Sequence, residues 1–213
     1  MLNLWGRISS INVRKVVWCA QELGLDFQRT EAGGAHGLVH TPEYLAMNPN
    51  ALVPLLQDGE DDARFVLWES NVIVRYLCAR HSHGLMYPEP LEARFDAERW
   101  MDWQQTTLNP AGRDAFVQLV RVPAAERDAQ AVAASIAATE PLVAMLDTHL
   151  AGRDFMTGER FTMADIPVAC EVHRWFGLPP TEYRRPSWPN VERWFDALRT
   201  RPAALGVLDL ALA

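Results

Sequence analysis

Residues 2–15 read LNLWGRISSINVRK, and this stretch decides the fold of the chain. Its first four residues have the apolar content of a strand, which a glycine then interrupts. A polar loop follows, after which Asn12 begins an apolar pattern with helical spacing. A helix that starts after such a loop presents free backbone N–H groups and the positive end of its dipole, which favour a bound anion. Ser9, Ser10 and Asn12 are the polar residues placed to use this site.

The composition is that of a globular protein and limits its partners. Of 213 residues, 49% are hydrophobic and 22% are charged, which suits one large domain or two small ones. The net charge of −7 argues against a nucleic-acid-binding surface. No run of consecutive apolar residues is long enough to cross a membrane, and the N-terminus lacks the order of a signal peptide. We therefore expect a cytoplasmic protein that binds neither nucleic acid nor membranes.

Cysteines and histidines give no sign of a disulfide framework or a metal site. The three cysteines are far apart in the sequence: Cys19, Cys78 and Cys170. Because they are odd in number and form no C-x-x-C motif, we expect them to be buried small hydrophobic residues. Two pairs of histidines are close in sequence: His36 with His40, and His81 with His83. Neither pair has a carboxylate or a cysteine at ligand spacing, so we expect no bound metal.

The periodicity of residues 1–80 predicts a mixed α/β domain with the order β-α-β-α-β-β-α. Strands are expected at residues 2–5, 26–30, 53–56 and 65–68, and helices at residues 12–23, from 41 to a turn at 48–50, and from 69 to about 80. Thr41 suits the cap of the second helix, with Pro42 in its first turn. Asp58 and Gly59 predict a hairpin turn.

The rest of the chain predicts a second, all-helical domain. Residues 81–90 contain two prolines and a glycine with little periodicity, which is typical of an interdomain linker. Helical patterns then cover residues 92–119, 124–150, 163–176, 191–199 and a short tail from 203. Thr162 and Asp165 have the spacing of a capping box, for which we expect a structural role. The second domain is thus expected at residues 91–213.

Three sites in the first domain suit the parts of one small ligand. The first is the serine-rich loop before residue 12. At the second, a cis bond between Val53 and Pro54 would leave the Val53 backbone free to pair with an extended, peptide-like ligand. At the third, Ser70 and the free N–H groups of a helix start suit a carboxylate, and Glu69 suits an ammonium group. A molecule with an α-amino-acid end, a peptide middle and a thiol satisfies all three.

Six short motifs occur in a fixed order along almost the whole chain. They are S-S-x-N-x-x-K-V at residues 9–16, E-L-G-L at 22–25, T-P-E-Y-L-A-x-N-P at 41–49, V-P at 53–54, W-E-S-N-x-I-x-x-Y-L at 68–77 and F-T-M-A-D-I at 161–166. In this order and spacing the chain resembles the glutathione S-transferase superfamily, and within it the cytosolic, bacterial, serine-type members related to the theta and nu classes. The resemblance implies a thioredoxin-like N-terminal domain with a mixed four-stranded sheet, an all-helical C-terminal domain, and a homodimer.

The resemblance also implies roles for individual residues. Ser10 would hydrogen-bond the thiolate of glutathione, with Ser9 and Asn12 as open alternatives and a helix cap as the plainer role of Ser10 and Asn12. The remaining glutathione contacts would come from His40, Leu52, Val53, Pro54, Glu69 and Ser70. The site of a small electrophile would involve Trp103, Arg113 and Phe116, for which ordinary core or surface positions are the plainer interpretation.

We therefore expect an enzyme that uses glutathione as co-substrate and needs no metal. A hydroxyl donor and a helix N-terminus both favour the thiolate, which is the nucleophilic form of a thiol. The leading hypothesis is a transferase that adds this thiolate to an electrophile. A peroxidase, disulfide reductase or isomerase that uses the same thiolate is the first alternative, and a non-catalytic binding or scaffold protein is the second.

Overall fold

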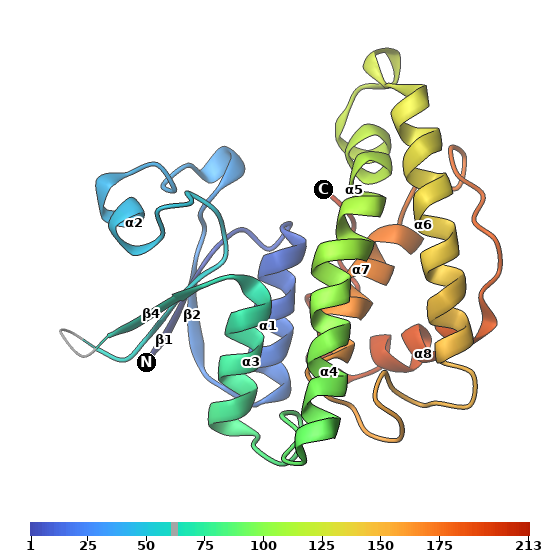
Figure 1. Ribbon diagram of the computed structural model, residues 1–213. Helices are drawn as coiled ribbons and strands as arrows, with labels where there is room; N and C mark the ends of the chain where they lie inside the picture. Colours follow the sequence, from blue (N-terminus) through green and yellow to red (C-terminus); the bar gives the residue numbers. More distant parts are fainter. Residues whose placement is uncertain (61–63) are drawn as a thin grey trace. The chain divides into compact units, whose positions relative to one another are not determined.

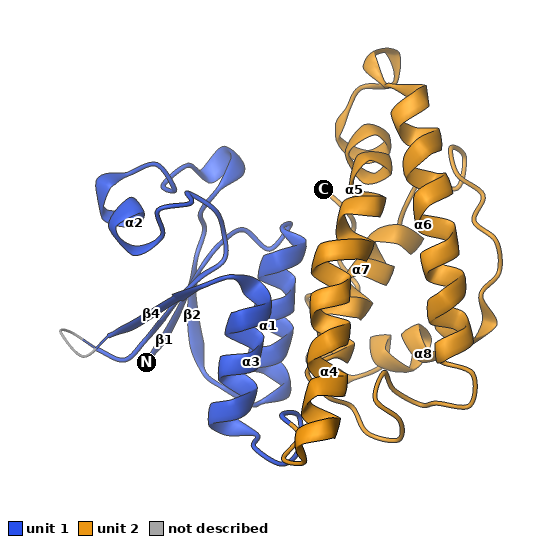
Figure 2. Ribbon diagram, in the orientation of Figure 1, with its two compact units in different colours: residues 1–87 blue, residues 88–213 orange. Residues whose placement is uncertain are grey.

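The computed structural model describes residues 1–60 and 64–213. The described residues form two compact units, Met1–Tyr87 and Pro88–Ala213 (Figure 2). Each unit has a buried core of its own. In the first unit the core includes Leu4, Val16 and Ile73, and in the second it includes Leu146 and Trp194.

The first unit has the predicted β-α-β-α-β-β-α order (Figure 1). Its elements are β1 (Leu2–Trp5), α1 (Ile11–Glu22), β2 (Phe27–Thr30), α2 (Pro42–Met47), β3 (Leu55–Asp58), β4 (Phe65–Trp68) and α3 (Ser70–His81). The strands form a four-stranded sheet in the order β2-β1-β3-β4. Because β1 and β2 are parallel while the other pairs are antiparallel, the sheet is mixed, as predicted.

Side chains alternate between the two faces of this sheet. Helices α1 and α3 pack against each other and lie side by side, away from α2 (Figure 1). A separate cluster contains Ala32, Val39, Tyr44 and Leu55. Trp5 lies opposite Leu55 in the β1–β3 register and packs against this cluster, so these two side chains share the face that α2 covers.

The third strand and its turn differ from the prediction. β3 begins at Leu55 rather than Val53, because Pro54 has no N–H to donate to the ladder and precedes the strand. Asp58 is part of β3 and lies opposite Phe65, so the predicted turn at Asp58 and Gly59 is wrong at its first residue. The connection to β4 includes residues 61–63, which lie outside the described part of the chain.

The second unit is helical. It contains α4 (Leu91–Trp103), α5 (Asn109–Phe116), α6 (Ala129–His149), α7 (Asp165–Phe176) and α8 (Pro189–Arg199). Between and beyond these helices lie π-helical turns at Gln104–Leu108 and Val117–Arg121 and 3-10 turns at Ala124–Glu126 and Pro202–Ala204. The helix predicted from residue 203 is therefore a single 3-10 turn.

Two predicted helices are interrupted or shortened for identifiable reasons. The helix expected at residues 92–119 is divided by the π-helical turn before α5, because Pro110 cannot donate to the carbonyl four residues earlier. The helix expected from residue 124 begins at Ala129. Asp128 caps it by accepting hydrogen bonds from the backbone N of Gln130 (2.9 Å) and Ala131 (3.0 Å).

Helix α6 is long and apolar enough to cross a membrane, judged by length and composition alone. Over 18 of its 21 residues the mean hydropathy is 1.4. It nevertheless makes the polar contacts of a helix packed in a globular unit. The Ser135 hydroxyl accepts from the backbone N of Ala115 in α5 (3.1 Å), and Asp147 accepts from the backbone N of Asn190 in α8 (2.8 Å).

Candidate active site

The sheet register brings three loop segments to one edge of the first unit. Trp5 lies opposite Leu55, and Leu55 lies opposite Trp68. The polar loop before α1, the cis peptide bond before β3 and the residue before α3 all lie directly beyond this row. The three segments that the sequence singled out are therefore neighbours in space.

The loop before α1 leaves hydrogen-bonding groups open. Ser10 is the N-cap residue, with φ −79° and ψ 124°, but its side chain makes no capping hydrogen bond. Asn12 lies inside the first turn, so its alternative interpretation as the cap is wrong. The buried Oδ1 atom of Asn12 has no hydrogen-bond partner in the part of the chain that the structure describes. Both side chains therefore remain available to a ligand.

Two arginines shape the same loop, and sequence reasoning missed both. Arg7 Nη1 donates a hydrogen bond of 2.6 Å to Ser9 Oγ. Arg14, which is buried in α1, donates from Nε to the carbonyl oxygen of Ile8 (3.0 Å). For Arg7, the one signal in the sequence was the position of a basic residue between the first strand and the serine pair.

The bond between Val53 and Pro54 is cis, as predicted. Helix α2 holds the residue before it, because Tyr44 Oη (2.6 Å) and Asn48 Nδ2 (2.8 Å) both donate to the carbonyl oxygen of Leu52. Burial raises the pKa of Tyr44 to about 12, so its hydroxyl stays a donor. These contacts give the T-P-E-Y-L-A-x-N-P motif a physical role, which is to hold the chain that leads into β3.

Val53 also lies against the loop before α1. A methyl group added to Gly6 would lie 3.3 Å from Val53 Cβ, and one added to Gly33 would lie 3.3 Å from Val53 Cγ1. Glycines at both positions, each with positive φ, let the valine approach closely. Within the described residues, the backbone N–H and C=O of Val53 have no hydrogen-bond partner.

The start of α3 is strained. Glu69 is its N-cap residue and has φ +71° and ψ 108°, a left-handed conformation that costs a non-glycine residue about 1–3 kcal/mol. Its side chain is exposed and makes no capping bond, whereas Ser70 is buried. Strain of this kind is retained where a site needs the geometry.

The remaining predicted glutathione contacts are on the surface. His40 is exposed in the turn before α2. The Leu52 side chain is 64% exposed, while its carbonyl is already bound by α2. Among the described residues, neither side chain has a contact that fixes it at the edge described above, so the roles of both residues remain predictions.

The three candidates for the electrophile site differ in exposure: Trp103 is half-buried, Arg113 is exposed and Phe116 is buried. The Trp103 ring packs edge-on against Trp100, with centroids 5.2 Å apart. Arg113 is exposed on α5. Phe116 is buried, and the guanidinium carbons of Arg121 and Arg174 lie 4.6 and 5.2 Å from its ring centroid.

A second arginine, Arg174 of α7, lies beside the Phe116 ring. It is buried beside Glu171, with which it forms an ion pair, and it donates to Asn109 Oδ1 (2.9 Å). Its charge is therefore already neutralised within the protein. Arg174 therefore offers no free charge to an anionic co-substrate.

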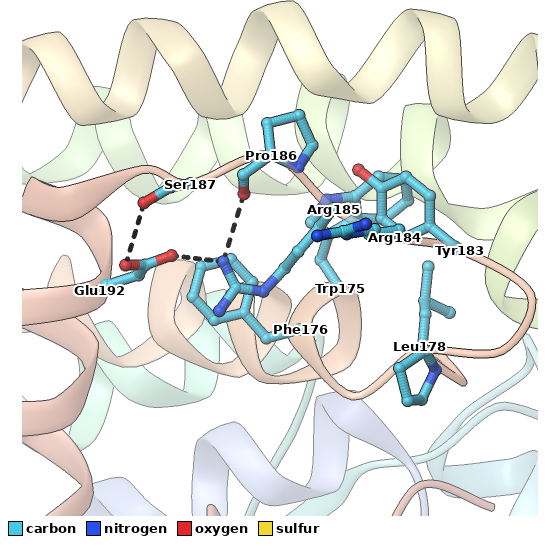
Figure 3. A pocket seen from close by; sticks show the side chains of 10 residues that line it. Trp175, Phe176, Leu178, Tyr183, Arg184, Arg185, Pro186, Ser187 and Glu192 are labelled. Atoms are coloured by element: carbon cyan, nitrogen blue, oxygen red, sulfur yellow. Dashed lines mark hydrogen bonds and ion pairs between the residues drawn. The ribbon is translucent and has the colours of Figure 1, made fainter.

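The second unit has a recess of about 410 Å³ near the end of α7 (Figure 3). Aromatic rings line it, but its polar groups are largely paired. Arg185 lies 4.0 Å from the Phe176 ring centroid and forms an ion pair with Glu192, whose pKa it lowers. Tyr183 donates to Glu140 (2.9 Å). The polar side chains that line the recess therefore bond mainly to other protein groups, which leaves few of them to bind a ligand.

The cysteines are buried, as predicted, and all three are free. The sequence did not predict that two of them meet: the Sγ atoms of Cys19 and Cys78 are 3.6 Å apart. Burial raises the pKa of the Cys19 thiol, which keeps it protonated and unreactive. Among the described residues, no group of three His, Cys, Asp or Glu side chains is arranged to hold a metal ion.

Known families and proteins match this chain from end to end. The family model "Glutathione S-transferase, N-terminal domain" matches residues 9–80, and "Glutathione S-transferase, C-terminal domain" matches residues 107–202. Glutathione S-transferase GstB of Escherichia coli K12 is 41% identical over 213 residues, with 100% of both chains covered. The chain belongs to the glutathione S-transferase family. The resemblance found in the sequence motifs is confirmed.

Solved structures of glutathione S-transferases have the same architecture. A theta-class enzyme from Xanthomonas axonopodis pv. citri, solved with glutathione bound, has a TM-score of 0.92 and 42% identity, covering 100% of this chain and 99% of its own. A glutathione transferase from Burkholderia graminis, solved with two glutathione molecules per subunit, has a TM-score of 0.87 and 25% identity, covering 98% and 87%. The predicted fold class, a thioredoxin-like domain with a helical one, is confirmed.

Proposed function

We propose that this glutathione S-transferase family member activates the thiol of glutathione for attack on an electrophilic small molecule. The observation that carries the proposal is the shared sheet edge, where the loop before α1, the Val53 backbone and the start of α3 meet. Each supplies groups that have no hydrogen-bond partner within residues 1–60 and 64–213. The full-length similarity to GstB and to a theta-class enzyme solved with glutathione supports the same ligand.

In this proposal Ser10 donates its hydroxyl hydrogen bond to the thiolate. Its side chain is not used as a helix cap, and it stands at the N-terminus of a 12-residue helix, whose dipole also favours an anion. Ser9 and Asn12 are the neighbouring alternatives. Lowering the thiol pKa by one unit corresponds to about 1.4 kcal/mol of stabilisation of the thiolate over the thiol.

The other glutathione groups are assigned by chemistry. The Val53 backbone, with Pro54 beside it, pairs with the cysteinyl part as a strand would. The γ-glutamyl end has an ammonium group for Glu69 and a carboxylate for Ser70 and the N–H groups of α3. His40 and Leu52 border the glycyl end.

We assign the electrophile to the second unit, where Trp103, Arg113 and Phe116 are the candidates. Arg113 is exposed and so accessible to an anionic co-substrate, whereas buried Phe116 would act by supporting the wall of the site. We also propose that the protein is a cytoplasmic homodimer. Its support is a set of exposed apolar side chains in each unit: Phe65, Trp68 and Val72, and Leu91 and Phe95.

The proposal is tested by conjugation of glutathione to a generic aryl halide, beside a peroxide-reduction assay, for wild type and Ser10→Ala. We expect conjugation in the wild type and a loss of about 10- to 100-fold in the variant, because raising the thiol pKa by one to two units depletes the thiolate by that factor. Glutathione binding, measured by calorimetry, should persist in the variant.

Other outcomes identify the alternatives. Full activity in Ser10→Ala would move the thiolate role to Ser9 or Asn12. Peroxide reduction without conjugation would favour the peroxidase or reductase alternative. A wild-type protein that does not bind glutathione at millimolar concentration would contradict the proposal and favour a non-catalytic scaffold.

A further inference from the structure

Arg7 is an arginine whose charge is not neutralised by any carboxylate in the described part of the chain. Its Nη1 atom donates to Ser9 Oγ at 2.6 Å, and its buried Nε atom has no hydrogen-bond partner among the described residues. Within residues 1–60 and 64–213, no carboxylate lies at ion-pair distance from it. A half-buried guanidinium that has no carboxylate partner, and whose buried Nε lacks an acceptor, favours an anion nearby, as does the helix N-terminus beside it.

The position of Arg7 is fixed by its own loop and by a glycine. Its backbone N donates to the carbonyl of Ala32 (3.0 Å), and its carbonyl accepts from the N of Ser10 (3.0 Å). A methyl group added to Gly34 would lie 2.9 Å from Arg7 Nε and 3.3 Å from its Cδ. The side chain therefore lies directly on Gly34, and the loop at residues 33–37 supports it.

The hydrogen bond from Arg7 to Ser9 determines where the hydroxyl proton of Ser9 can point. Ser9 Oγ accepts from a cation, so its own O–H cannot point at Arg7 and is left to donate elsewhere. A hydroxyl that accepts from a guanidinium is also a stronger donor, because hydrogen bonds in a chain polarise one another. Ser9 lies next to Ser10, the cap residue of α1.

We propose that Arg7 is a positioning residue for the thiolate of bound glutathione and acts through Ser9. Arg7 holds the Ser9 hydroxyl so that it donates a second hydrogen bond to the sulfur, beside the one from Ser10, and its charge favours the thiolate. This inference rests on the proposed function and adds to Ser10 and the α1 dipole a further contribution to the lowered thiol pKa.

The test is the pKa of the thiol of bound glutathione, followed by ultraviolet absorbance of the thiolate in a pH titration. Wild type is compared with Arg7→Gln, Arg7→Lys and Ser9→Ala, each saturated with glutathione. Arg80→Gln is the matched control, because Arg80 is an exposed arginine of the same unit that pairs with Asp58. Melting temperatures check that each variant is folded.

We expect Arg7→Gln to raise the thiol pKa by about one unit, a tenfold loss of thiolate near neutral pH. Ser9→Ala should raise it similarly, and the double variant should raise it no further than the larger single effect, since the two act as one unit. Arg7→Lys should raise it less, because the charge remains. Arg80→Gln should match the wild type.

A wild-type thiol pKa in Arg7→Gln would overturn the inference, even if glutathione bound more weakly, because that pattern belongs to an arginine that binds a carboxylate of glutathione. If Arg7→Gln fails to fold, Ser9→Ala decides by the same readout. Failure of the wild type to bind glutathione would overturn the proposed function itself, a result that calorimetry separates from an unchanged thiol pKa.

Discussion

At the scale of single residues, Asp165 shows how a local motif acquires a larger role. The capping-box spacing predicted its bond to the backbone N of Thr162, which is 2.9 Å long. The fold adds two donors that the local sequence could not indicate, the backbone N of Met156 (2.9 Å) and Trp194 Nε1 (3.0 Å). The carboxylate thus ties α7 to α8 and to the chain before α7, and it is fully buried.

This position makes the stability of the protein depend on pH. Burial raises the pKa of Asp165 from 3.8 to about 6, although its three N–H donors lower it. The contribution of such a group is complete below its unfolded-state pKa and is lost as pH rises through the folded-state value. A shift of about two pKa units corresponds to about 3 kcal/mol.

We therefore predict that Asp165→Asn removes this dependence. The free energy of unfolding of the wild type, relative to the variant, should fall by up to about 3 kcal/mol between about pH 4 and about pH 7. Urea unfolding of both proteins across this range measures it, and the comparison cancels other titrating groups. A difference that stays constant with pH would contradict the shift.

Single residues also show what the sequence could not reveal about the site. Ser10, Val53 and Glu69 stand in short motifs, so their neighbours in the chain are enough to propose them as site residues. The position of Arg7 is determined by its contacts with Gly34 and Ala32. These contacts depend on the parallel pairing of β1 and β2. Contacts made by folding, rather than by adjacency, are what the motifs leave out.

At the scale of elements, the sequence predicted the kind and order of nearly every helix and strand. Its errors lie at element ends and in the helix expected at residues 92–119, which a π-helical turn divides. Pro110 and Pro54 moved an element boundary, because each lacks the N–H that a helix or ladder needs. Asp128 moved another, because its carboxylate caps α6. Periodicity identifies the buried face of an element, but these backbone effects determine where it begins.

Helix α2 gives a prediction at this scale. Tyr44→Phe keeps the buried ring but removes the donor to the Leu52 carbonyl, which retains its bond from Asn48. We expect a loss of about 1 kcal/mol in the free energy of unfolding and a several-fold weaker affinity for glutathione, because Val53 follows directly. Calorimetric titration and urea unfolding measure the two effects.

Tyr76→Phe provides the control for this substitution. Its hydroxyl bonds to Asp58 at 2.6 Å, at the end of β3 away from Val53. It should lose comparable stability while glutathione affinity stays at the wild-type value. Equal losses of affinity in both variants would mean that α2 has no special part in holding the site.

At the scale of the whole molecule, apolar side chains remain exposed in both units. Phe65 and Trp68 lie on β4, and Phe65 packs on the Tyr76 ring of α3, with centroids 5.1 Å apart. Leu91 and Phe95 are four residues apart on α4, each 59% exposed, and so share one helix face. An exposed apolar surface within one unit is typical of an interface between proteins.

We predict that a second copy of the chain covers these side chains, so that Phe95→Glu dissociates the dimer. Burying an unpaired carboxylate in an apolar contact should weaken association by about 100-fold, or about 3 kcal/mol. Sedimentation of the wild type should give twice the 24.0 kDa chain mass, and the variant should approach a single chain mass at the same concentration. Leu205→Glu, at an exposed position beyond α8, should stay dimeric. A wild type that sediments as a single chain, or a Phe95→Glu variant as dimeric as the control, would place these side chains outside any interface.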